Sequence, residues 1–358
     1  MTSSSFPTIR LPNMLDNWPW PRTLHSQYES LRADSAAWLS QYKSESLGVQ
    51  KVFAGGNSES LLASLVWPDV DYESLRAGCD LISSVIITDD CLDVETGSSA
   101  EAIIDAILHA FHHPEAPTPP SAPIAAEITR QAWTRAMKLG SPSQRRRFIQ
   151  KYGDFLRAIT KEAEDRDTEY VRDIEEYMQV RRDTIASRPA FWVVECLSGI
   201  PEHIADHPSI LKLSEYATEL IIITNDVVSY NKEQAQGSIH NLVAIAMLSL
   251  NLTVQEAMDW TGALFESIVQ KFIAALNEVP SWGPNIDSKV AVYIDGLGNW
   301  VRGHEVWSFE CLRYFGKKGK EIRTSRLVTL LPPRSVTGRA DAQVPPPLVT
   351  RPPAATVC

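Results

Sequence analysis

The stretch TNDVVSYNKEQAQG, at residues 224–237, continues a run of apolar residues and carries three oxygen-bearing side chains at intervals of four. These side chains belong to Asn225, Ser229 and Glu233. Residues four apart lie on one face of an α-helix, so the spacing predicts a helix that presents the three side chains together. The stretch therefore predicts both a helix and a polar site on an otherwise apolar segment.

A second stretch, IITDDCLDVETG at residues 86–97, has the same character. Asp89 and Asp93 stand four apart, and Asp90 lies beside the first of them. Neither cluster contains His or Cys, and ligand sets made only of oxygen favour a hard cation such as Mg²⁺. Since Mg²⁺ commonly shares its coordination between a few protein oxygens and phosphate oxygens of a substrate, we interpret the clusters as two walls of a diphosphate-binding cavity.

The composition is that of a folded enzyme with an acidic balance of charge. The chain has 358 residues, of which 44% are hydrophobic, and its formal net charge is -10. It is long enough to bury a substantial core. Binding to nucleic acid depends on clustered Lys and Arg, so the acidic balance argues against nucleic acid as a partner.

The chain shows no signal for secretion or for a stable membrane anchor. The N-terminus lacks the apolar segment of a signal peptide, and no run of about 18 apolar residues occurs. The five cysteines are widely spaced and include no Cys-x-x-Cys pair, which favours reduced thiols over disulfides or zinc ligands. We therefore expect a cytoplasmic protein.

Apolar residues recur at helical spacing along most of the chain, and Pro and Gly separate the helical stretches. No stretch alternates convincingly between apolar and polar residues, as a half-buried strand would. The pattern predicts an all-α, single-domain helical bundle over residues 25–330. An irregular segment, 1–24, precedes it, and a Pro-rich tail, 331–358, follows it and is expected to be disordered.

The two clusters resemble the metal-binding motifs of the class I terpene synthases, most closely fungal sesquiterpene synthases of the basidiomycete type. The first family motif, D-D/E-x-x-D, corresponds to Asp89, Asp90 and Asp93. The second motif, N-D-x-x-S-x-x-x-E, corresponds without a gap to Asn225, Asp226, Ser229 and Glu233. The resemblance covers most of the chain and implies the class I terpenoid synthase helical bundle, which encloses an apolar cavity.

Three further matches concern the diphosphate. The resemblance implies an arginine sensor, for which Arg182 lies 43 positions before the second motif, although the adjacent Arg181 is an open alternative. It also implies a contact from Lys232 and from the C-terminal pair Arg313 and Tyr314. Charged donors suit this role because charge-assisted hydrogen bonds are roughly twice as strong as neutral ones.

Other positions concern the carbocation that this family forms when the diphosphate leaves the substrate. The family has a small effector residue, often Gly, four positions after the sensor arginine, and Ala186 holds that place here. Ile86 stands where the family often has an aromatic residue. We predict Trp307 as an aromatic wall of the cavity, with Trp300 and Phe309 as further candidates.

The resemblance implies a magnesium-dependent sesquiterpene synthase. Such an enzyme binds three Mg²⁺ ions with the diphosphate, ionises farnesyl diphosphate, cyclises the cation and releases diphosphate. The alternatives are a chain-elongating prenyltransferase, whose family pattern has two D-D-x-x-D motifs, and a catalytically silent prenyl-diphosphate-binding protein. A monomer and a homodimer are both compatible with the sequence.

Overall fold

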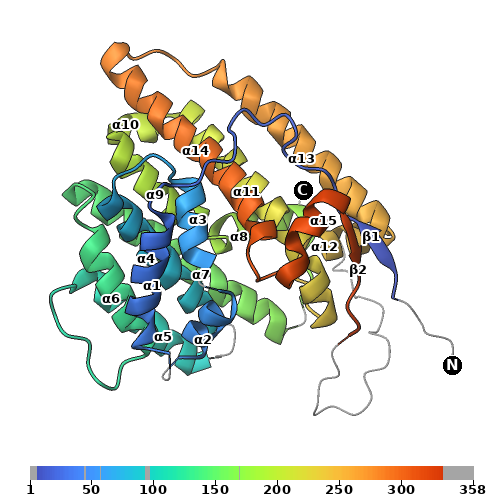
Figure 1. Ribbon diagram of the computed structural model, residues 1–358, viewed down its shortest axis with the longest axis horizontal. Helices are drawn as coiled ribbons and strands as arrows, with labels where there is room; N and C mark the ends of the chain where they lie inside the picture. Colours follow the sequence, from blue (N-terminus) through green and yellow to red (C-terminus); the bar gives the residue numbers. More distant parts are fainter. Residues whose placement is uncertain (1–5, 44–45, 57, 93–96, 169, 334–358) are drawn as a thin grey trace, which may run out of the picture.

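The computed structural model describes residues 6–43, 46–56, 58–92, 97–168 and 170–333. Within these ranges the chain forms fifteen α-helices and two short strands, which confirms the predicted all-α class (Figure 1). The elements are β1 (Thr8–Arg10), α1 (Tyr28–Ser40), α2 (Leu47–Ala54), α3 (Ser58–Val66), α4 (Tyr72–Leu92), α5 (Gly97–His112), α6 (Ile124–Ala136), α7 (Pro142–Asp167), α8 (Ile174–Thr184), α9 (Ser187–Ser198), α10 (Glu202–Ala205), α11 (Pro208–Ala235), α12 (Leu242–Leu250), α13 (Val254–Leu276), α14 (Pro284–Glu310), the 3₁₀-helix η1 (Gly316–Lys318), α15 (Gly319–Ser325) and β2 (Leu327–Thr329). The predicted site residue Asp93 and the Pro-rich tail from residue 334 onward lie outside the described residues.

Local capping signals set the start of helices near the centre of the molecule. α8 begins with a capping box, in which Asp173 and Glu176 each accept a hydrogen bond from the other's backbone N–H. α12 begins after Asn241, whose side-chain oxygen accepts from the Val243 N–H at 2.9 Å. These side chains satisfy N–H groups that the first turn of a helix leaves unpaired. The boundaries of both helices are therefore encoded locally.

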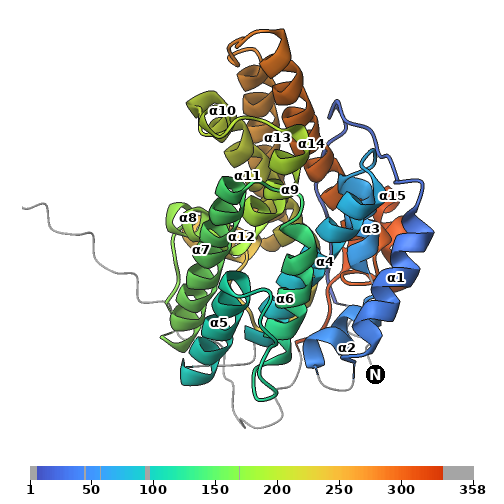
Figure 2. The same cartoon turned by 90° about the vertical axis from the view of Figure 1, so that its left-hand side faces the viewer.

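Five helices form a closed ring about the centre of the bundle. α14 packs against α3, α9 and α11, and α4 packs against α3 and α9. The contact between α9 and α11 completes the ring, and the turned view shows these helices grouped together (Figure 2). The ring brings segments from both ends of the sequence around one central space.

Two glycines let α14 approach its neighbours closely. A Cβ added at Gly296 would lie 2.1 Å from Cγ1 of Val194 on α9. A Cβ added at Gly303 would lie 3.0 Å from the backbone carbonyl of Leu65 on α3. Any larger residue at these positions would push α14 outward and change the shape of the central space.

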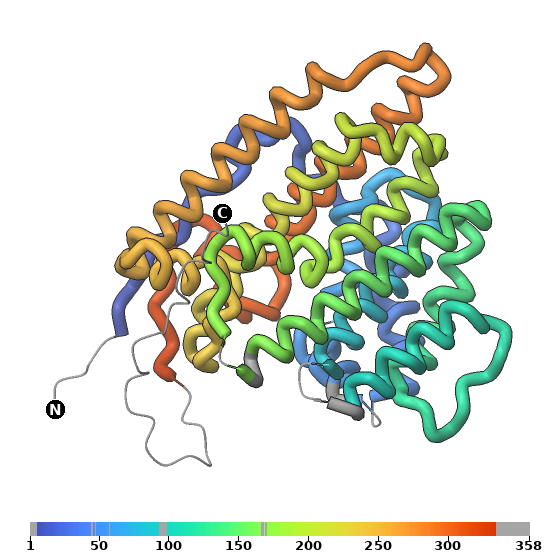
Figure 3. Tube along the Cα trace, turned by 180° about the vertical axis from the view of Figure 1, so that it is seen from behind, coloured from blue at the N-terminus to red at the C-terminus, as the bar shows by residue number. Residues whose placement is uncertain are grey.

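The two strands join the ends of the described chain. β1 pairs antiparallel with β2, with Thr8 opposite Thr329. The N-terminal segment then runs beside α13 and α14, where Trp18 Nε1 donates to the Gly298 carbonyl at 2.9 Å (Figure 3). The sequence did not indicate this ribbon, because each strand is only three residues long and its partner lies at the other end of the chain.

None of the helices in the described ranges is by itself long and apolar enough to cross a membrane. By length and composition alone, α12 and α13 are together long and apolar enough to do so, as a pair bent by 111°.

Candidate active site

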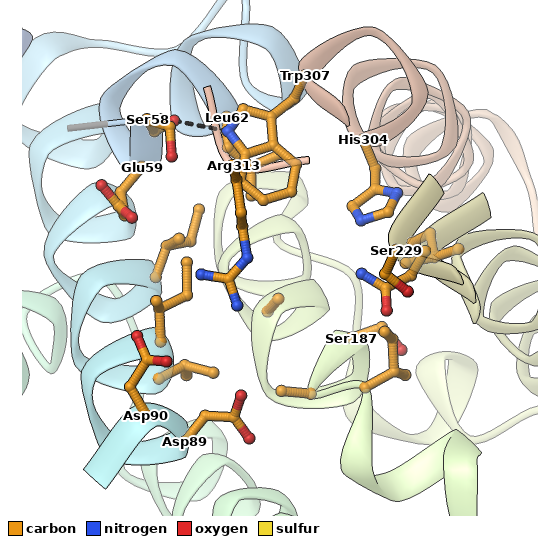
Figure 4. A pocket seen from close by; sticks show the side chains of 18 of the residues that line it. Ser58, Glu59, Leu62, Asp89, Asp90, Ser187, Ser229, His304, Trp307 and Arg313 are labelled. Carbon is orange, nitrogen blue, oxygen red and sulfur yellow. Dashed lines mark hydrogen bonds between the residues drawn. The ribbon is translucent and has the colours of Figure 1, made fainter. Parts of the chain in front are cut away.

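The ring of helices surrounds a cavity of about 730 Å³. Asp89 and Asp90 lie on α4 at one side of it, Ser229 lies on α11 at another, and the Arg313 guanidinium points between them (Figure 4). The aliphatic lining comes from several helices and includes Leu62, Leu81, Ile82, Val85, Ile86, Val193 and Ile221. The cavity thus combines a polar region with an apolar one.

The acidic wall on α4 contains a buried carboxylate that is only partly satisfied. Oδ1 of Asp90 accepts from Lys51 Nζ at 2.9 Å. Oδ2 of Asp90 is buried and has no hydrogen-bond partner among the described residues. Leaving a carboxylate oxygen buried without a donor is costly, so this atom is suited to bind a cation. Asp89 lines the cavity beside it.

The α11 wall presents Asn225, Ser229 and Glu233 to the same cavity. Asn241, at the start of α12, donates to Glu233 Oε2 at 2.9 Å and to Ser229 Oγ at 3.4 Å. These two bonds orient the Glu233 and Ser229 side chains. Burial, together with the negative charge of Asp226, raises the pKa of Glu233.

Asp226, the second residue of the α11 motif, has a different position. Its Oδ2 accepts from the Tyr177 hydroxyl at 2.5 Å and from the Leu242 N–H at 2.9 Å. Asp226 does not line the cavity with the other members of the motif. Asp226 therefore links α8 and α12 to α11 by hydrogen bonds, outside the lining of the cavity.

The oxygen donors on the two walls fit a hard cation in type. Within the described ranges, no three His, Cys, Asp or Glu side chains are already gathered as a metal site. The donors are instead divided between α4 and α11, and the unpartnered Asp90 oxygen leaves a position for a cation. This division fits ions that arrive together with an anionic ligand that reaches both walls.

The structure distinguishes the two neighbouring arginines. Arg181 lines the cavity, and its Nη2 donates to Asn225 Oδ1 at 2.8 Å and to Asp226 Oδ1 at 3.3 Å. Arg182 is not among the lining residues, and its Nε donates to Glu219 Oε1 at 3.0 Å. Consecutive residues of a helix point about 100° apart, and here that offset turns Arg182 toward Glu219 on α11. Of the two candidates for the sensor, Arg181 is thus the one that lines the cavity, and Arg182 does not line it.

The other three donors expected at the diphosphate line the cavity. Burial would lower the pKa of Arg313, but the nearby Tyr314 and Asp90 outweigh it and raise that pKa, so the guanidinium stays charged. The Tyr314 hydroxyl accepts from Asn225 Nδ2 at 3.0 Å. Burial and the charge of Arg313 lower the pKa of Lys232. Their common position at the polar region favours binding of an anion there.

Aromatic residues form part of the apolar region. Trp307 lines the cavity, and its Nε1 donates to the Ser58 carbonyl at 2.8 Å (Figure 4). Trp300 also lines the cavity and meets Trp67 edge-on, with ring centroids 5.4 Å apart. Phe309 does not line the cavity, because its ring stacks on Phe315 instead.

Ala186 lies at the break between α8 and α9 and lines the cavity. Its backbone is left-handed, with φ 58° and ψ 16°, a conformation that costs an L-residue about 1–2 kcal/mol. Its carbonyl accepts only a long hydrogen bond, of 3.3 Å, from the Ala190 N–H. The break thus places a residue with a weakly engaged carbonyl at the cavity wall.

Several polar lining residues were not identified from the sequence, among them Glu162 and His240. Lys51 and Glu59 come from α2 and α3, and His304 comes from α14. Burial raises the pKa of Glu59 to about 7. The available signal was a charged residue inside an apolar helix, as in the run SESLLASLV, but this pattern does not say what the residue faces.

Known proteins match both the sequence and the fold. Residues 80–271, more than half of the chain, match the family described as "Terpene synthase family 2, C-terminal metal binding". Delta(6)-protoilludene synthase 18 of Postia placenta is 37% identical over 329 residues, which is 92% of this chain and 94% of that protein. The Delta(6)-protoilludene synthase of Armillaria gallica is 39% identical over 325 residues, which is 90% of this chain and 94% of that protein.

Among solved structures, linalool/nerolidol synthase from Streptomyces clavuligerus shares the fold, with a TM-score of 0.71 at 21% identity. The match covers 81% of this chain and 98% of that one. Hedycaryol synthase matches with a TM-score of 0.68 at 22% identity, over 82% of this chain and 98% of that one. This chain therefore belongs to the terpene synthase family and is a terpene cyclase.

Proposed function

We propose that this protein is a magnesium-dependent sesquiterpene synthase that ionises farnesyl diphosphate, cyclises the cation and releases diphosphate. The observation that carries the proposal is the pair of oxygen-donor walls on α4 and α11 that face one cavity, with Arg313 between them (Figure 4). The names of the relatives, which include several protoilludene synthases and "Sesquiterpene synthase 14", support a C15 substrate.

In this proposal the two walls hold the metal ions, three in number, with the diphosphate. The ligands would be Asp89, Asp90, Asp93, Asn225, Ser229 and Glu233, directly or through bound water. Bound Mg²⁺ would supply Lewis-acid stabilisation of the negative charge that the diphosphate gains on leaving. Asn241 supports this role by fixing the orientation of the Ser229 and Glu233 side chains.

The protein's own cations complete the stabilisation of the leaving group. Arg181, Lys232, Arg313 and Tyr314 would donate hydrogen bonds to diphosphate oxygens. Preorganised donors in a site that excludes water need no rearrangement when charge develops, so they favour the ionised state over the intact ester. The raised pKa of Arg313 supports a donor that stays charged throughout.

The apolar region would protect and fold the cation. Trp300 and Trp307 offer ring faces, which attract positive charge, and the aliphatic side chains beside them offer the cation no nucleophile. The weakly engaged Ala186 carbonyl would act as the effector that reaches the substrate, since a carbonyl oxygen has a second lone pair to offer.

The test is incubation of the purified protein with farnesyl diphosphate, with and without Mg²⁺, followed by gas chromatography and mass spectrometry. We expect a cyclic C15 product only with Mg²⁺, and its loss in Asn225→Ala. Asn285→Ala is the matched control, because Asn285 is exposed at the start of α14 and should keep full activity. No product from farnesyl, geranyl or geranylgeranyl diphosphate would overturn the proposal, and product only with a second prenyl substrate would indicate an elongase.

The cytoplasmic location and the monomeric or homodimeric state stay predictions. Size-exclusion chromatography with light scattering would distinguish the two assembly states.

A further inference from the structure

His304 is a buried imidazole that faces the cavity without a bonded Nδ1. It lies on α14, its residue is 5% exposed, and its ring is directed into the cavity (Figure 4). Its Nδ1 is buried and has no hydrogen-bond partner among the described residues. A buried polar atom left unpaired costs about 1–3 kcal/mol, and such a cost in a native structure calls for an explanation.

Other histidines of the molecule do not show this feature. His25 is equally buried, but its Nε2 contacts the Val70 carbonyl at 2.8 Å and its Nδ1 accepts from the Gln27 N–H at 3.0 Å. His240, which also lines the cavity, is bonded to Glu162 at 2.7 Å. Unlike these two rings, His304 has a ring nitrogen that no described neighbour engages.

The surroundings keep the His304 ring neutral. Burial and the positive charge of Arg181 lower the pKa of His304 to about 3. The ring therefore carries a free lone pair at neutral pH. The low basicity is no obstacle toward a carbocation, because the hydrogens next to a cationic carbon are far more acidic than imidazolium.

The position of His304 relative to the tryptophans places its imidazole ring beside the apolar region. Trp300, His304 and Trp307 follow one face of α14 at intervals of four and three. The ring centroids of His304 and Trp307 are 5.6 Å apart. Since ring faces attract a cationic centre, a cation held against Trp307 would lie near the imidazole.

We propose that His304 accepts the proton that ends the cyclisation, an inference that rests on the proposed function. An imidazole nitrogen takes a proton from a carbon next to the cationic carbon, and the electrons of the broken C–H bond form the double bond of the product. The positive charge passes from the carbocation to the imidazolium, so the net charge of the site does not change in this step. The proton returns to solvent when diphosphate and product leave.

The experiment compares wild type with His304→Phe and His304→Gln, both of which lack a basic nitrogen. Diphosphate release from farnesyl diphosphate with Mg²⁺ reports ionisation, and the product profile reports how the cation is quenched. We expect diphosphate release to stay within a few-fold of wild type. The main product should fall by at least about tenfold relative to other alkenes and alcohols, since general bases contribute about 10²–10⁴-fold.

Two controls separate proton transfer from packing. Ser308→Ala alters the residue whose hydroxyl donates to the His304 carbonyl at 2.8 Å and does not line the cavity, so it should leave the profile unchanged. Added imidazole should restore the main product in His304→Ala, which a purely structural role would not allow.

The outcomes are distinguishable. An unchanged profile in folded His304→Phe or His304→Gln, with wild type active, overturns the role of His304 and leaves the proposed function intact. Absence of magnesium-dependent diphosphate release in wild type overturns the proposed function itself, and this inference with it.

Discussion

Arg181 donates a hydrogen bond of 2.8 Å to Asn225 Oδ1. The guanidinium of this α8 residue is therefore bonded to an oxygen that we propose as a metal ligand. Asn225 in turn donates from Nδ2 to the Tyr314 hydroxyl at 3.0 Å. In the proposed function, arrival of metal and diphosphate would replace both partners of Asn225. This exchange would couple α8, α11 and the segment after α14 to substrate binding.

Replacing Arg181 by Gln is expected to lower kcat/KM for farnesyl diphosphate by about 10²–10³-fold, which is the usual cost of removing a preorganised donor at a developing anion. Arg182→Gln is the matched control and should lose only a few-fold, because Arg182 bonds Glu219 instead. The rate of diphosphate release measures kcat/KM for both variants. A larger loss in the Arg182 variant would return the sensor role to Arg182.

Glu59 should make the free energy of unfolding depend on pH. Its pKa is raised from 4.5 to about 7 by burial, so the folded state binds the proton more tightly than the unfolded chain. Stability should therefore fall as pH rises from about 4.5 to about 7 and level off above, by on the order of 3 kcal/mol from this residue.

The Glu59→Gln variant has a neutral side chain at every pH. Its free energy of unfolding should therefore decline less between about pH 4.5 and about pH 7. Urea unfolding of both proteins across the pH series measures the difference. Parallel pH profiles for the two proteins would refute a protonated Glu59.

Ala186→Gly should raise the free energy of unfolding by about 1 kcal/mol, because glycine adopts the left-handed backbone at φ 58° without the steric cost that alanine bears. Ala190→Gly is the matched control within α9 and should lower stability by about 1 kcal/mol. Denaturant unfolding compares the two. A loss of stability in Ala186→Gly would show that the break is not strained.

Gly78→Ala should disturb the cavity wall. An added Cβ would lie 2.3 Å from the Trp67 ring, so the indole must move. We expect a stability loss of about 1–3 kcal/mol, typical of overpacking, and altered product ratios. Gly153→Ala, whose Cβ would meet nothing closer than Arg157 Nη1 at 3.5 Å, is the control and should stabilise by up to about 1 kcal/mol. An unaltered product profile in folded Gly78→Ala would argue that Trp67 does not shape the cation.

Much of the site follows from spacing in the sequence. Asn225, Ser229 and Glu233 share a face of α11 because the helical period brings residues four apart together, and this holds whatever the helix packs against. The all-α class follows from the same periodicity.

Other features depend on contacts between distant segments. The choice between Arg181 and Arg182 depends on how α8 is rotated against α11, which no local pattern specifies. The β1–β2 ribbon needs a partner 321 residues away. Phe309 turned out to stack on Phe315 rather than face the cavity, for the same reason.

The sequence by itself determined the helices, the two oxygen-donor motifs and the family to which they belong, because these rest on intervals of three and four residues along single helices. Only the tertiary structure decided which arginine faces the cavity, that Glu59 and Lys51 join it, and that His304 has an unengaged Nδ1. Those properties arise where helices meet, and the direction of a side chain relative to another helix is set by packing rather than by position in the chain.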